Sequence, residues 1–129
     1  VSLIPVSVGN PHAVIFVDDI EKAPLTKLGP RIEHHEAFPD GVNVEFVEVL
    51  GADKLRMRVW ERGSGVTMAC GTGACASVMA AIAAKLFPYD ETVSVLLDGG
   101  TLKIQIAPDN TVQMTGPAEI VYEGETEIC

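Results

Sequence analysis

The chain has 129 residues, which suits one domain, and 47% of them are apolar, enough for a substantial core. Its 18 acidic residues outnumber its 9 basic ones, so the net charge of −9 disfavours nucleic acid and acidic membrane surfaces as partners. The apolar runs are too short or too often interrupted to span a bilayer, and we expect one domain over residues 1–129.

The first half of the chain predicts strands and one short helix. Residues 13–17 form an apolar run before two aspartates and predict a strand. Residues 21–36 contain two prolines and a glycine, which leave room for a short helix beginning near Pro24. Residues 43–50 and 55–60 alternate apolar and polar side chains, and the Gly-Ala-Asp between them predicts a hairpin turn.

The longest apolar segment, residues 72–87, predicts a helix without a polar face. Such a helix must be buried on all sides, which one flat sheet cannot do. The second half of the chain otherwise predicts strands at 92–97, 101–107, 111–116 and 118–124, with turns at 98–100 and 108–110. We therefore predict an α+β fold, in which a strongly curved, mainly antiparallel, barrel-like sheet of six or seven strands wraps around one central apolar helix.

The three cysteines are Cys70, Cys75 and Cys129, an odd number that argues against a disulfide framework and indicates the reducing cytoplasm. Cys75 lies inside the predicted helix, where a buried structural role is favoured, and Cys129 is the last residue. The chain opens at Val1 without an initiator methionine, so we expect a domain from a longer polypeptide.

Cys70 directly precedes Gly71, Thr72 and Gly73, where the predicted helix begins. The first N–H groups of a helix lack intrahelical partners and bind anions such as a carboxylate, and the same field lowers the pKa of a thiol. This arrangement suits proton abstraction next to a carboxylate, as in an amino acid. From composition alone, a structural role for Cys70 is equally favoured.

Two other patterns carry less weight. Residues 71–76 match the dinucleotide fingerprint G-x-G-x-x-A, but its acidic partner, Glu91, would precede a strand instead of ending one. His34, His35 and Glu36 are adjacent, so their side chains point in different directions, and we interpret them as a solvated loop with no metal.

Four segments carry a family resemblance: ERGSGVTMACGTGACA at 61–76, GNPHAVIFVD at 9–18, GVNVEFVEV at 41–49 and MTGPAEIVYEG at 114–124. Together they closely resemble diaminopimelate epimerase, and the match runs over nearly the whole chain. The resemblance implies two similar halves, each a curved sheet around a helix, with the site between them. This chain resembles the C-terminal half only, so the N-terminal half would be absent.

The resemblance implies an isomerase that interconverts LL- and meso-diaminopimelate for lysine and cell-wall precursor synthesis. Two cysteines act on opposite faces of the substrate, one removing the α-proton and one returning it, with no cofactor, metal or pyridoxal. Cys70 matches the C-terminal cysteine, and its partner would lie on the N-terminal half. We therefore expect this chain alone to be inactive, and the intact protein to be a cytoplasmic homodimer.

The resemblance also assigns roles to other residues. His12 and Glu61 join Cys70 as candidate catalytic residues, with His12 tuning its protonation. The candidate substrate-binding residues are Asn10, Asn43, Glu61, Arg62, Gly71 and Thr72, and Tyr122 matches a tyrosine at the dimer interface.

Each of these residues has a structural alternative. Glu61 and Arg62 suit an exposed ion pair, and Asn10 suits a turn before a proline. In the same way, Asn43 is suited to begin a strand, and His12 is suited to a purely structural role. Tyr122 is suited to a position on a face of the barrel.

Two alternative functions remain open at this point. The first is a related racemase of the histidine or proline type. The second is a non-catalytic module that binds a carboxylate at the helix start, for which no thiol at Cys70 is needed.

Overall fold

The computed structural model describes residues 3–7, 11–39, 41–61, 65–67, 71–97, 100–115 and 121–123. The described helices are η1 (Ile20–Lys22), α1 (Leu25–Glu33) and α2 (Gly71–Ala83). The described strands are β1 (Ile4–Ser7), β2 (Pro11–Phe16), β3 (Asn43–Gly51), β4 (Lys54–Glu61), β5 (Gly65–Thr67), β6 (Val93–Leu97), β7 (Gly100–Ile106), β8 (Val112–Thr115) and β9 (Val121–Glu123).

All nine described strands belong to one sheet, in the order β1-β2-β3-β4-β6-β7-β8-β9, with β5 also paired to β4. Among the described strands, six pairs are antiparallel, while β2 pairs with β3 and β4 pairs with β6 in parallel. The sheet is therefore mainly antiparallel, as predicted. The described sheet has nine strands instead of the expected six or seven, because β1 and β5 lack a clear signal in the sequence. The two parallel pairs also carry no such signal.

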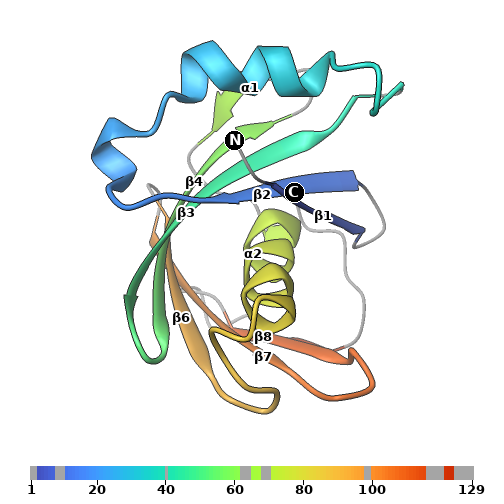
Figure 1. The fold of residues 1–129 in the computed structure, drawn as a ribbon. Coiled ribbons are helices and arrows are strands. Elements are labelled where there is room, and N and C mark those ends of the chain that lie inside the picture. Colours follow the sequence, from blue (N-terminus) through green and yellow to red (C-terminus); the bar gives the residue numbers. More distant parts are fainter. Residues whose placement is uncertain are drawn as a thin grey trace.

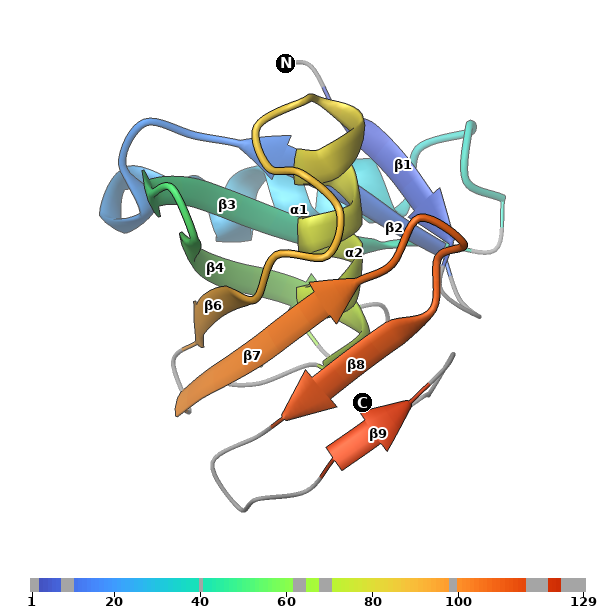
Figure 2. The same cartoon turned by 90° about the horizontal axis from the view of Figure 1, so that it is seen from below.

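The helix α2 lies inside this curved sheet, which confirms the predicted architecture. Figures 1 and 2 show β1, β2 and β3 on one side of α2, and β7 and β8 on the other. The helix contacts strands on both sides, including β1, β2 and β7. Its first eight residues, 71–78, are buried, and its alanine side chains let the surrounding strands approach closely.

The helix α2 ends at Ala83, four residues before the predicted Phe87. Lys85 has a left-handed backbone with φ of 63°, and its N–H donates to the carbonyl of Ile82 over 2.9 Å. The next N–H, that of Leu86, donates to the carbonyl of Ala81, also over 2.9 Å. This pair of bonds is the Schellman arrangement, which satisfies the last carbonyls of a helix and stops it.

A second layer covers the outer face of the sheet. The short helix expected near Pro24 is α1, and it packs over β3 and β4 (Figure 1). A separate apolar core lies under α1, and it includes Ala13, Val44 and Phe46. The strands β2, β3 and β4 are therefore sandwiched between α1 and α2.

The prediction of a solvated loop is also confirmed, because His34, His35 and Glu36 are exposed where α1 ends. None of the helices in the described part of the chain is long and apolar enough to cross a membrane.

Candidate active site

The start of α2 is the centre of the predicted site. Gly71 and Thr72, the predicted carboxylate-binding residues, form its first turn and are buried. The first N–H groups of any helix need partners from outside the helix, so this end can hold an anion. Cys70, Asn10 and Arg62 lie outside the described residues, and their predicted roles stay predictions.

The sheet register shows how the chain enters α2. Thr67, the last residue of β5, pairs with Val59 of β4. Val59 also pairs with Glu45 of β3, and Glu45 pairs with Val14 of β2. Thr67 thus stands in the same row of the sheet as Glu45, two strands away, or about 10 Å. Gly71 follows Thr67 by four peptide units, a reach of at most about 14 Å. The start of the helix therefore lies within about 14 Å of Thr67.

His12 and Asn43 lie side by side next to that row. They are register partners at the start of the parallel strands β2 and β3, and both are buried. The Asn43 Nδ2 amide donates to the carbonyl of Pro11 over 3.4 Å. Two predicted site residues from separate segments of the sequence are thus neighbours at the edge from which both strands start.

His12 also makes a contact that sequence reasoning missed. Its Nδ1 lies 2.7 Å from Oε2 of Glu45, and both side chains are fully buried. Glu45 occupies the middle of a strand covered on both faces, where a carboxylate requires a compensating partner. A glutamate in an apolar strand such as Asn43–Gly51 is the available signal, but recognising it requires knowing that α1 covers the other face.

Two further predicted residues are described by their backbone only. Glu61 follows Trp60, which pairs with Val44, so Glu61 lies at the same end of the sheet as Asn43. Tyr122 lies in β9 and pairs with Met114 of β8. The structure thus brings His12, Asn43 and Glu61 to one end of the sheet, while Tyr122 belongs to the last strand.

Cys75 has the structural character expected from the sequence. It is 2% exposed within the α2 core. Desolvation raises the pKa of its thiol to about 12, only partly opposed by a backbone hydrogen bond. A thiol held in the neutral form is a poor nucleophile and a poor base at neutral pH.

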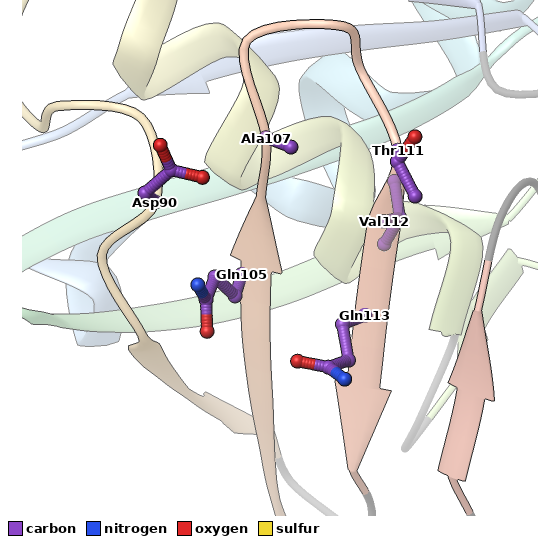
Figure 3. A pocket seen from close by; sticks show the side chains of 6 residues that line it. All are labelled: Asp90, Gln105, Ala107, Thr111, Val112 and Gln113. Atoms are coloured by element: carbon purple, nitrogen blue, oxygen red, sulfur yellow. The ribbon is translucent and has the colours of Figure 1, made fainter.

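A cavity of about 280 Å³ lies elsewhere, beside β7 and β8 (Figure 3). Gln105 and Gln113, which are register partners, point from neighbouring strands beside it, and Asp90 lies above Gln105 in this view. Gln105 alternates with the core residues Ile104 and Ile106, so it faces away from α2. This cavity is therefore distinct from the predicted site, which faces the helix.

Comparison with protein families identifies one match along most of the chain. The model of the family described as diaminopimelate epimerase matches residues 4–121. Among curated relatives, the diaminopimelate epimerase of Bacillus cytotoxicus is 59% identical and that of Bacillus cereus strain ATCC 14579 is 58% identical, each over 122 residues. These alignments cover 95% of this chain but 42% of each relative, so the chain spans less than half their length.

Solved structures share the fold at low sequence identity. A PhzF-family phenazine biosynthesis protein of Bacillus anthracis gives a TM-score of 0.58 at 18% identity, over 87% of this chain and 37% of that one. A probable proline racemase of Agrobacterium radiobacter K84 gives 0.59 at 11% identity, over 88% and 40%. These likenesses confirm the architecture, and the sequence matches confirm the resemblance: this chain belongs to the diaminopimelate epimerase family.

Proposed function

We propose that this chain is part of an amino-acid epimerase that interconverts LL- and meso-diaminopimelate without a cofactor. Membership of the family supports the reaction class. The observation that carries the proposal is the pairing of the buried residues His12 and Asn43 at the start of β2 and β3, with Glu61 at the same end of the sheet.

In the proposed mechanism, the Cys70 thiolate removes the α-proton, so that the C–H bond breaks and an S–H bond forms. The electron pair left on the substrate is delocalised into its carboxylate, which the N–H groups of Gly71 and Thr72 bind at the start of α2. His12 adjusts the protonation of Cys70. A second acid on the opposite face then returns a proton and inverts the centre.

The remaining contacts bind the rest of the substrate. Arg62 is suited to hold a carboxylate with two hydrogen bonds, and Glu61 is suited to accept hydrogen bonds from an ammonium group. Asn10 and Asn43 complete the proposed substrate-binding set.

We further propose that the second acid belongs to the other half of a longer, cytoplasmic polypeptide. The chain spans 42% of its relatives' length, which leaves room for a second half of similar fold. The proposed homodimer contact involves Tyr122. The chain alone is then expected to leave LL-diaminopimelate unepimerised, because one thiol cannot serve both faces.

A chimera tests the proposal directly. The aligned 122 residues of the Bacillus cytotoxicus relative are replaced with those of this chain, to which they are 59% identical. The chimera is expected to epimerise diaminopimelate and to exchange its α-proton with deuterated water, both followed by NMR. Cys70→Ser in the chimera is expected to lower kcat at least about a hundredfold, because it removes a proton-transfer group.

Cys75→Ala is the matched control, since Cys75 is a buried cysteine in the same segment. It is expected to keep the activity within about threefold, because the substitution changes packing rather than chemistry. A folded chimera without activity, or one in which Cys70→Ser is harmless, contradicts the proposal.

A further inference from the structure

Glu45 is a buried carboxylate that contacts a predicted site residue. Its Oε2 and the Nδ1 of His12 lie 2.7 Å apart, and neither side chain is exposed to solvent. Such a short distance between an imidazole and a carboxylate is typical of a charge-assisted hydrogen bond. The two residues come from different strands, 33 positions apart in sequence, so the contact depends on the folded sheet.

Both side chains face the helix α2. His12 lies two residues before Val14 on β2, and Glu45 lies two residues before Val47 on β3, so each shares a face with a valine of the core around α2. Among the described side chains of α2 and of the strands packed against it on this face, the titratable ones are His12, Glu45 and Cys75. Glu61, which is described by its backbone, lies at the end of β4. Glu45 is thus the acidic side chain that the structure places directly against His12.

The geometry limits what the imidazole can do. Because an ionised carboxylate can only accept hydrogen bonds, an ionised Glu45 requires the shared proton to lie on Nδ1 of His12. The other ring nitrogen, Nε2, is then the one through which the ring can exchange a proton with a neighbouring group. Acidic partners fix the tautomer and orientation of imidazoles in other proton-transfer sites.

We propose that Glu45 is a positioning residue for the reaction: it holds the proton on Nδ1 of His12, so that Nε2 takes the proton of the Cys70 thiol and later gives it back. In this step the S–H bond breaks and an Nε2–H bond forms, leaving a thiolate beside an imidazolium. The carboxylate of Glu45 balances the new positive charge. This inference rests on the function proposed above.

The first test measures the tautomer of His12 by ¹⁵N NMR of the imidazole rings in the chain itself. His34 and His35 are exposed and serve as internal references. His12 is expected to carry a proton on Nδ1 at neutral pH. Glu45→Gln keeps an acceptor and is expected to retain this proton, whereas Glu45→Met, of similar size, is expected to lose it.

The second test measures kcat and KM in the chimera. Glu45→Met is expected to lower kcat at least about tenfold with KM changed less than about twofold, because it disturbs proton transfer rather than binding. Glu45→Gln is expected to retain more activity than Glu45→Met, since it preserves the tautomer. Glu48→Gln is the control, because Glu48 lies on the same strand but its carboxylate accepts from the N–H of Ile20.

The outcomes separate the two proposals. A wild-type His12 protonated on Nε2 alone overturns the positioning role, even where Glu45→Met does not fold. An active chimera in which Glu45→Met keeps kcat within about twofold overturns the role of Glu45 and leaves the proposed function intact. A folded chimera without activity while Glu45 is intact overturns the proposed function, and the positioning role with it.

Discussion

Individual residues in this chain owe their chemistry to where the fold places them. Cys75 and Cys70 are five positions apart, yet the helix carries Cys75 into the apolar core, where its thiol stays neutral. The same helix begins at Gly71, immediately after Cys70 in the sequence, and helix starts commonly bind anions. The structural cysteine therefore lies inside the helix, whereas the proposed catalytic one precedes it in the sequence.

The raised pKa of Cys75 predicts a dependence of stability on pH. The unfolded chain releases the thiol proton near the ordinary value of 9.0, whereas the folded chain retains it up to about 12. Between these values the unfolded state binds fewer protons, so the free energy of unfolding falls as the pH rises from 9.0 towards 12. Urea unfolding at about pH 8 and about pH 10 measures this loss.

Cys75→Ala provides the comparison. It is expected to be less stable than the wild type at about pH 8 because it leaves a small cavity, but to lose less stability on going to about pH 10. Equal losses in the two proteins contradict the assignment of the effect to Cys75.

The helices and strands are held by local features that the sequence reveals only in part. The apolar character of residues 72–87 correctly predicts a buried helix inside a curved sheet, because no other arrangement covers all its sides. It does not predict the end at Ala83, since a lysine in the left-handed conformation is uncommon and carries no sequence signal. The parallel pairs also escape prediction, because alternation describes the faces of a strand and not its neighbours.

The end of α2 predicts a stabilising substitution. Lys85 has a φ of 63°, a conformation that glycine adopts without the steric cost paid by other residues. Lys85→Gly is expected to raise the free energy of unfolding by about 0.5–1 kcal/mol, after allowing for the greater entropy of glycine in the unfolded chain. Urea unfolding measures the change, and Lys85→Ala, which keeps the strain, is expected to give no gain.

The packing of α1 on the sheet predicts a destabilising substitution. A Cβ at Gly29 would lie 2.4 Å from Cγ of Trp60, whose indole N–H donates to Oε1 of Glu33 over 2.8 Å. Gly29→Ala is therefore expected to push α1 from the sheet and to lower the free energy of unfolding by about 1–3 kcal/mol.

Gly51→Ala is the matched control, because a Cβ there meets nothing within 4 Å. It is expected to change the free energy of unfolding by less than about 0.5 kcal/mol. If both alanine variants unfold at the same urea concentration, the close contact between α1 and Trp60 is not a determinant of stability.

At the scale of the whole molecule, strand pairing in the sheet brings residues of the proposed site together. His12 and Asn43 are 31 positions apart, and the parallel pairing of β2 with β3 makes them neighbours. Their convergence is expected from the family resemblance but cannot be worked out from periodicity, because the register of a parallel pair depends on the intervening helix. The buried Glu45 beside them emerges only from the folded structure.

The parallel pairing of β4 with β6 also has a consequence for how quickly the chain reaches its native state. The register pairs Lys54 with Ser94, 40 positions later in the sequence, and such long-range pairings are slow to form. Until then the apolar sides of α2 are open to water. Refolding from urea is therefore expected to pass through an early species that binds a hydrophobic dye and aggregates as protein concentration rises. Dye fluorescence that never exceeds the native level during refolding would show instead that the strands close around α2 as early as the helix forms.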